Sequence, residues 1–242
     1  MSLDLGAGLD PGADALGAAR PEADGPGRYY GLYPATVSEN QDPDNQGRVK
    51  VRLPWSPDTG TTQYDVWARL ATTMAGSDRG TWFVPESGDE VLVGFGGGDP
   101  DHPYVVGALW NGQDAPPKTI NPTNDVKAIV SRTGITITLD DTSGAVTLSL
   151  ETPGGQKVSL QDGGNRVTVA DVTGNTLEMS PSGVSITAVG KLSITASSLQ
   201  IDAPKATVNS AIWTYSGVVK TDTIIASTVV GSSYTPGAGN IW

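Results

Sequence analysis

The only histidine in the chain, His102, is the first side chain to consider as a catalyst or a metal ligand. It lies between Asp101 and Pro103, in an expected loop. One imidazole supplies neither a catalytic triad nor the ligand set of a zinc site. The chain has no cysteine, which excludes disulfides and thiolate metal sites. The sequence therefore predicts no catalytic residue, no metal and no cofactor here.

Two further segments resemble ligand-binding loops. Asn40, Asp42 and Asp44 loosely resemble a calcium loop, but the glycine comes at the wrong offset and no glutamate closes the twelve-residue pattern. The three glycines at 96–98 could suggest a phosphate-binding loop, yet they join two expected strands and precede no helix. Both segments are predicted to be turns.

The adjacent acids Asp140 and Asp141 raise the question of a glycosidase, which uses two carboxyl groups about 5 to 9.5 Å apart. Adjacent residues at the end of a strand point to opposite faces. Residues 142–144, Thr-Ser-Gly, follow as a turn. We expect a solvated hairpin corner, and the chain is predicted not to be an enzyme.

A β repeat from about residue 134 to residue 208 organises the chain. Short apolar groups alternate with Ser, Thr, Asp or Gln, the period-two pattern of half-buried strands. The spacing between groups falls from about 11 or 12 residues to about 7 or 8 along the chain. The apolar positions are Ile135, Ile137, Leu139, Val146, Leu148, Leu150, Val158, Leu160, Val167, Val169, Leu177, Met179, Val184, Ile186, Leu192, Ile194, Leu199, Ile201, Ala206 and Val208.

One such unit cannot be stable alone. Ordering eight residues costs about 1 to 2 kcal/mol each in backbone entropy, and two or three buried aliphatic side chains return roughly 1.5 to 3 kcal/mol each. No amphipathic helix nearby could cover the apolar positions. Either one chain coils into a solenoid or several identical chains bury these residues inside a prism. Units of seven or eight residues supply one strand and one corner, which favours a prism of three chains.

Residues 29–113 have a different pattern, that of a compact all-β module. Five strands joined by tight turns are expected at 31–37, 48–53, 66–70, 90–95 and 104–109. Five strands in about 85 residues suit a small closed barrel of the OB type. The net charge of −11 and the lack of a basic patch argue against nucleic acid as a partner.

Three motifs in this module resemble the OB domain of the phage baseplate assembly protein V and VgrG spike family: GRVKVRLPW (47–55), FVPESGDEVLVGF (83–95) and GDPDHPYVVGALWNGQDAPP (98–117). The resemblance implies an all-β chain, an OB barrel followed by an intertwined trimeric β-helix or β-prism. It also implies a central spike of a contractile tail or injection system, which docks on a hub through its barrel and pierces an envelope mechanically. Such a part is assembled in the bacterial cytoplasm and becomes a component of a virion or of an extracellular or secretion particle.

The expected organisation is an arm (1–28), an OB domain (29–115), a linker (116–128), a β-helical needle (129–208) and a tip (209–242). Only 28 residues precede the barrel and no lysozyme-like segment follows it, so a hub and any wall hydrolase are expected from other chains. The family's apical iron site needs a His-x-His that is absent after position 102.

The C-terminal end of a prism leaves its last strands open, which predicts a cap. Either the tails fold over their own tip or a PAAR-type protein binds there, with Tyr234, Ile241 and Trp242 as the contact candidates. The alternative function is a trimeric tailspike that binds or cleaves glycans. Outward Thr and Ser residues could serve it, but the repeat has no aromatic residue.

Overall fold

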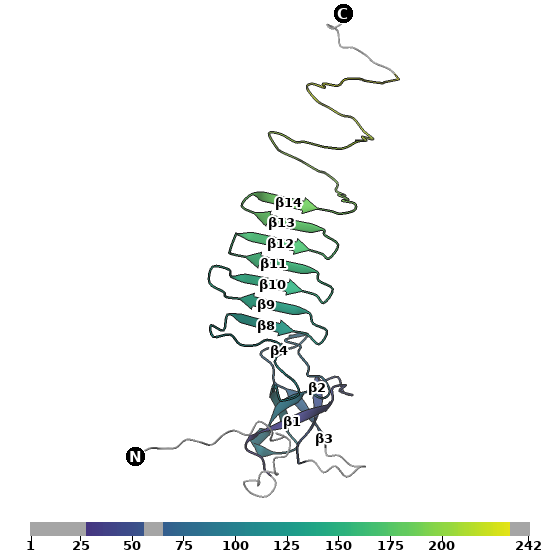
Figure 1. Cartoon of the computed structure of the whole chain (residues 1–242). Helices are drawn as coiled ribbons and strands as arrows, with labels where there is room; N and C mark the ends of the chain where they lie inside the picture. Colours follow the sequence, from purple (N-terminus) through teal and green to yellow (C-terminus); the bar gives the residue numbers. More distant parts are fainter. Residues whose placement is uncertain (1–27, 56–64, 233–242) are drawn as a thin grey trace, which may run out of the picture. The chain divides into compact units, whose positions relative to one another are not determined.

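The computed structural model describes residues 28–55 and 65–232 (Figure 1). The tip candidates Tyr234, Ile241 and Trp242 and almost all of the expected arm lie outside the described residues. The described chain is built from β-strands and turns, and the only helical element in it is one 3-10 turn. The predicted all-β class is confirmed. Nowhere in 28–55 or 65–232 is there a helix with the length and apolar character needed to cross a membrane.

Five strands form a closed barrel in the order β1-β2-β3-β7-β6. All neighbouring strands pair antiparallel except β3 and β7, which are parallel. The predicted barrel is confirmed, and the expected strands agree with the observed ones to within about two residues. The strands are β1 (Leu32–Glu39), β2 (Arg48–Arg52), β3 (Asp65–Leu70), β6 (Glu90–Phe95) and β7 (Pro103–Ala108).

Alternation along these strands fills the barrel with small aliphatic side chains. In β2, Val49 and Val51 are fully buried, whereas the residues between and beside them face outward. A barrel of five strands has a narrow interior, which suits valine and alanine better than larger residues. The buried core is Ala35, Val37, Val49, Val51, Leu53, Ala68, Val91, Val93 and Val105.

Two features between the barrel strands complete the module. A two-residue hairpin, β4 (Ala75–Gly76) with β5 (Arg79–Gly80), lies between β3 and β6 and was not anticipated. The three glycines at 96–98 form the 3-10 turn η2 (Gly96–Gly98) between β6 and β7, with Gly97 and Gly98 at φ of 60° and 76°. The expectation of a turn there is confirmed, because the next element is a strand.

The second part is one antiparallel sheet of seven strands in the order β14-β13-β12-β11-β10-β9-β8. Each strand pairs with the next along the chain, and the turns alternate between the two sides of the sheet (Figure 1). Its first strand starts inside the segment expected to be a linker. The strands are β8 (Val126–Val130), β9 (Thr136–Asp140), β10 (Thr147–Glu151), β11 (Lys157–Gln161), β12 (Arg166–Ala170), β13 (Thr176–Ser180) and β14 (Gly183–Thr187).

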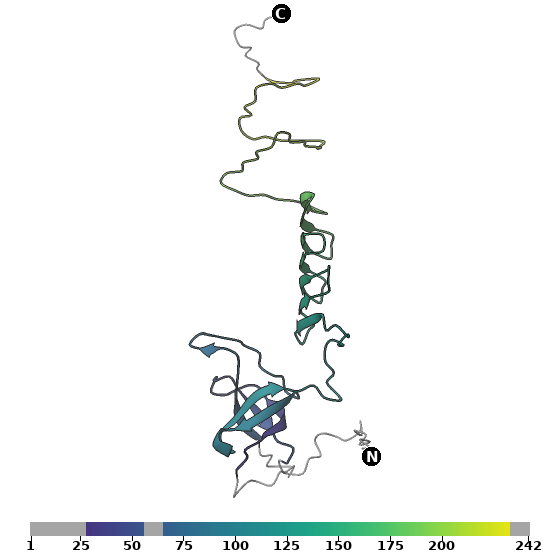
Figure 2. The same ribbon diagram turned by 90° about the vertical axis from the view of Figure 1, so that its left-hand side faces the viewer.

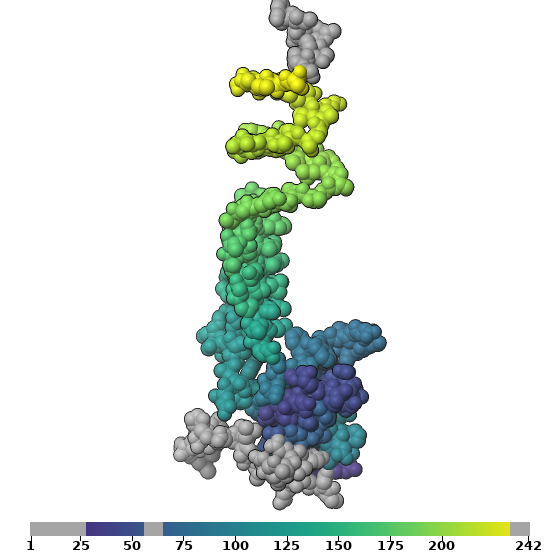
Figure 3. All heavy atoms as spheres, turned by 90° about the vertical axis from the view of Figure 1, so that its right-hand side faces the viewer, coloured from purple at the N-terminus to yellow at the C-terminus, as the bar shows by residue number. Residues whose placement is uncertain are grey.

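The expected strands around 192–194, 199–201 and 206–208 are not formed within the chain. From 190 to 232 all residues are described, yet they contain no strand and form no backbone–backbone hydrogen bond with any described residue. Figure 3 shows this yellow-green segment as a path one chain thick. Contacts within the chain divide it into two units, with the division after Val189. Alternation predicted the strand-forming residues correctly for six of the repeats, but it does not reveal whether a partner strand exists in the same chain.

Candidate functional site

One face of the seven-stranded sheet carries almost all of its apolar side chains. The pairing register aligns them in two columns, because Leu139, Leu148 and Leu160 are direct partners, as are Ile137, Leu150 and Val158. We call this surface the apolar face. Its two columns consist of Ile129, Ile137, Leu139, Leu148, Leu150, Val158, Leu160, Val167, Val169, Leu177, Met179, Val184 and Ile186, with Lys127 as the only charged residue. We include Ile135 and Val146, which directly precede β9 and β10 and continue the same alternation.

These side chains are much more exposed than core residues. Leu148 is 39% exposed, Leu160 44% and Ile186 59%, whereas the valines of the barrel core are 0 to 3% exposed. In the view of Figure 2 the strands of this sheet stack in a single layer. A sheet with one apolar side needs that side covered to be stable in water. The described residues of the chain do not supply that cover.

The opposite side of the sheet, the polar face, carries hydroxyl and charged side chains. Thr138, Ser149, Ser159 and Thr168 form its central column. Ion pairs join the neighbouring strands on the same side, Lys157 Nζ to Glu151 at 3.9 Å and Arg166 Nε to Glu178 at 3.6 Å. The sheet is therefore amphipathic from β9 to β14, whereas in β8 Lys127 lies in the apolar columns and Val126, Ala128 and Val130 lie on the opposite side.

Asp171 holds the turn between β12 and β13 in shape. Its carboxylate accepts hydrogen bonds from the backbone N–H groups of Thr173 and Asn175 at 2.8 and 2.9 Å, and from both side chains. The Asn175 amide, followed by the Thr173 hydroxyl and the two N–H groups, lowers the Asp171 pKa to about 2. The side-chain Oδ1 of Asn175 in turn accepts from the Val189 N–H at 2.8 Å. The Asp171 carboxylate therefore stabilises the turn through these hydrogen bonds.

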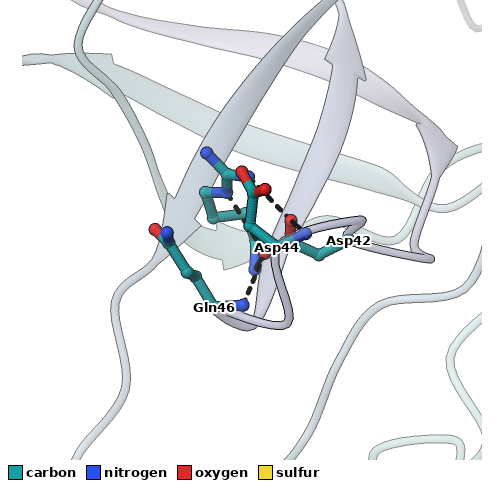
Figure 4. Close-up of polar contacts among 4 residues, drawn as sticks. Asp42, Asp44 and Gln46 are labelled. Atoms are coloured by element: carbon teal, nitrogen blue, oxygen red, sulfur yellow. Dashed lines mark hydrogen bonds and ion pairs between the residues drawn. The ribbon is translucent and has the colours of Figure 1, made fainter.

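The acidic loop before β2 is closed by an arginine. The Asp42 carboxylate accepts from the N–H groups of Asp44, Gln46 and Arg48, and the Arg48 guanidinium binds both Asp42, at 2.7 Å, and Asp44, at 2.5 Å (Figure 4). Hydrogen bonding from Arg48 holds the pKa of Asp42 well below its usual range. Both carboxylates are thus paired with Arg48, and the expectation of a turn is confirmed.

The pair Asp140 and Asp141 lies at the corner after β9. Asp140 Oδ1 accepts from the hydroxyl of Thr142 at 2.6 Å and from its N–H at 3.0 Å, and the Thr142 hydroxyl is the main cause that lowers the pKa of Asp140. Asp141 forms an ion pair with Lys127 at 3.2 Å. A glycosidase needs one carboxyl group with a raised pKa. The arrangement is that of a solvated hairpin corner, as expected.

His102 lies in the loop between η2 and β7. Its Nδ1 is 3.2 Å from Asp99 Oδ2, and the imidazole is 65% exposed. Within residues 28–55 and 65–232, no group of three or more His, Cys, Asp or Glu side chains gathers closely enough to hold a metal ion. These contacts show a local loop interaction.

Beyond the sheet, residues 190–232 expose pairs of β-branched residues. Val218, Ile225 and Val230 are 94 to 97% exposed, each next to a second apolar residue that is less exposed. The doublets at these positions were noted in the sequence. The described part of the chain leaves all six of these side chains more than half exposed.

Sequence reasoning missed one set of residues in the sheet, the apolar side chains of its turns. Pro153 lies over Gly134, Val172 over Gly155 and Val189 over Gly174; a Cβ added to those glycines would meet them at 3.6, 2.7 and 3.2 Å. These three glycines are 21 and 19 residues apart, which is the length of two strands with their turns. That spacing could have indicated turns stacked on the same side of the sheet.

Comparison with known proteins identifies the barrel. A family model for the type VI secretion system/phage-baseplate injector OB domain matches residues 33–110. Among similar proteins is the actin cross-linking toxin VgrG1 of Vibrio cholerae, 36% identical over 88 residues, 36% of this chain and 8% of that protein. The type VI secretion system spike protein VgrG3 of Vibrio cholerae is 34% identical over 113 residues, 46% of this chain and 11% of that protein.

The spike protein VgrG2a of Pseudomonas aeruginosa is 31% identical over 137 residues, 54% of this chain and 16% of that protein. The chain thus spans only 8 to 16% of the length of these curated relatives. The barrel is an injector OB domain of the type VI secretion system/phage-baseplate family, and the resemblance of the chain to the VgrG-like baseplate and spike proteins is confirmed.

Proposed function

We propose that three copies of this chain form the central spike of a contractile tail or contractile injection system. The observation that carries the proposal is the apolar face: seven strands expose one continuous apolar surface in a chain whose barrel is an injector OB domain. Three such sheets, turned inward, form a closed prism with a shared apolar interior. Each copy supplies one side of the prism.

The energy available supports this arrangement. Eleven of the fifteen apolar side chains of this face are 39 to 69% exposed in each copy, and full burial of one aliphatic side chain contributes about 1.5 to 3 kcal/mol. Covering the exposed half contributes roughly 1 kcal/mol for each residue, or on the order of 10 kcal/mol for each copy. That is enough to offset the entropy lost when copies associate.

Residues 190–232 support the same assembly in a different way. Backbone N–H and C=O groups must find partners when they are removed from water, and none of them pairs with another within this segment. The segment is rich in β-branched residues at alternating or doublet positions, unlike a disordered linker. In the spike these residues pair with the same segment of the other two copies, so the three chains intertwine beyond β14.

The spike acts by force and catalyses no reaction. Continuous hydrogen-bonded ladders resist compression along the stack, and opening one strand requires its neighbours to open. The carboxylates of Asp42, Asp140 and Asp171 are all committed to turns. The match to the relative named as an actin cross-linking toxin covers only 8% of that protein.

The partners follow from the two ends of this arrangement. The barrels dock on a separate hub protein, and a PAAR-type protein or the chain's own tails, through Tyr234, Ile241 and Trp242, cap the other end. The target membrane is contacted mechanically. The particle is assembled in the bacterial cytoplasm and belongs to a virion or to an extracellular or secretion machine. A glycan-binding tailspike is not proposed, because residues 121–211 contain no aromatic side chain for a sugar to stack on.

Purification of contractile particles through a tag on this chain, expressed in its native cell, tests the function. The proposal predicts co-purification with tube and baseplate proteins and three copies of the chain per particle. Recovery of the tagged chain free of any contractile component, or at a different ratio, would contradict it.

A further inference from the structure

The turns of the seven-stranded sheet lie along two opposite margins, at the ends of its strands, and these two margins have different shapes. One side, the knob margin, consists of the turns at 131–135, 152–156 and 171–175 and the exit at 188–189. The other side, the glycine margin, consists of the turns at 141–146, 162–165 and 181–182. Because consecutive strands are antiparallel, the turns alternate strictly between these margins.

The knob margin carries a row of apolar side chains. Pro153, Val172 and Val189 each lie over a glycine of the preceding turn on the same margin. Val172 is still 63% exposed and Val189 68%. The space above each of these glycines is therefore filled by a side chain of the same chain. The three apolar side chains project from the margin as knobs.

The glycine margin is open in part: a Cβ added to Gly163 would meet the Gly144 carbonyl oxygen at 2.6 Å, but three other glycines face open space. A Cβ added to Gly144, Gly164 or Gly183 would meet no atom within 4 Å. All three have positive φ, at 76°, 106° and 130°, so side chains are disfavoured there by conformation as well. Two larger apolar side chains lie at these turns: Val146, which belongs to the apolar face, and Pro181, in the turn 181–182.

We propose that the knob margin of one copy interdigitates with the glycine margin of the next copy, head to tail around the prism. This inference rests on the proposed function and names the contact that closes the assembly. A cyclic assembly of three requires each copy to present two different, complementary surfaces. The occupant of each margin is a second copy of this chain, because only another copy repeats the same two-strand step along three successive turns.

The offset between the margins fits this contact. Strands are spaced about 4.8 Å apart, so turns on one margin recur about every 9.6 Å, and the two margins are out of step by one strand. Rotation about a three-fold axis introduces no shift along it. Val172 of one copy therefore lies level with the gap between the 162–165 and 181–182 turns of its neighbour.

The absence of cysteine from the chain allows a clean cross-linking test. The full-length double variant Val172→Cys, Ser182→Cys should form inter-chain disulfides on oxidation, which require Cα atoms within about 7 Å. Non-reducing electrophoresis should then show covalent trimers. In the matched control, Val172→Cys with Ser143→Cys, the cysteines lie three strand spacings apart along the stack, about 14 Å, and should not cross-link.

Light scattering on the reduced variants separates the possible failures, and circular dichroism checks their fold against the native chain. A mass of three chains without disulfides in the 172/182 pair, or with equal cross-linking in the control, overturns the margin contact and leaves the spike in place. Cross-linking by Val172→Cys alone indicates like margins in contact and also overturns it. A mass of one chain for reduced variants and native protein alike overturns the spike as well.

Discussion

The substitution Leu148→Ala tests whether the apolar face holds the copies together. Leu148 lies between Leu139 and Leu160 in one column and is 39% exposed in the single chain. Covering that remaining fraction contributes about 0.6 to 1.2 kcal/mol for each copy, from 1.5 to 3 kcal/mol for a whole leucine side chain. Three copies lose roughly 2 to 3.5 kcal/mol, so the association constant for trimer formation should fall about thirty-fold to three-hundred-fold.

Sedimentation equilibrium over a dilution series measures that constant directly. The matched control is Ser149→Ala, one residue further along β10 and on the polar face. It should leave association unchanged within about two-fold. If Ser149→Ala dissociates the protein and Leu148→Ala does not, the polar face is the interface and the reasoning is refuted.

Three further perturbations test the barrel, a turn and the effect of pH. Val51→Ala truncates a fully buried side chain of the barrel core and should lower the free energy of unfolding by about 2 to 3 kcal/mol. Denaturant titration of the full chain measures this change. A change below about 0.5 kcal/mol would mean that the side chain of Val51 is not packed in the barrel. Gly155→Ala places a Cβ 2.7 Å from Val172 at a φ of +83° and should lower the free energy of unfolding by about 1 to 2 kcal/mol. In the control, Gly190→Ala, the added Cβ meets no atom within 4 Å, so the melting temperature should not change. Equal effects of the two substitutions would argue against the stacked turns. The folded-state pKa of Asp171, lowered to about 2, lies below its unfolded value of about 3.9. The stabilisation by this carboxylate is therefore present above about pH 4 and is lost as the pH falls toward 2. In Asp171→Asn the melting temperature should decline less between pH 4 and pH 2 than in the native chain, and an equally steep decline would contradict this.

Local alternation predicted the strands well because one-sided burial imposes a period of two. The barrel strand with Val49 and Val51 and the sheet strand with Leu148 and Leu150 both lie where the pattern placed them. Turn positions were equally predictable, since residues such as Gly97 need positive φ.

What alternation could not reveal was the partner of each strand. The pattern at Leu192 and Ile194 resembles that at Val184 and Ile186, yet only the latter pair lies in an in-chain strand. Spacing does not reveal it either, because the step from Leu177 to Val184 is seven residues and β13 pairs with β14 through the two-residue turn 181–182, whereas the same step from Leu192 to Leu199 forms no strand. The closure of Asp42 by Arg48 also escaped prediction, because it depends on a side chain folding back across a loop.

The mass of the intact protein in solution is the most direct test of the central claim. Light scattering of the full chain should give about 75 kDa, three times the 24.9 kDa of one chain, and this mass should persist on dilution. A mass of one chain at every concentration would contradict the account, because the apolar face would then be stable in water without a partner.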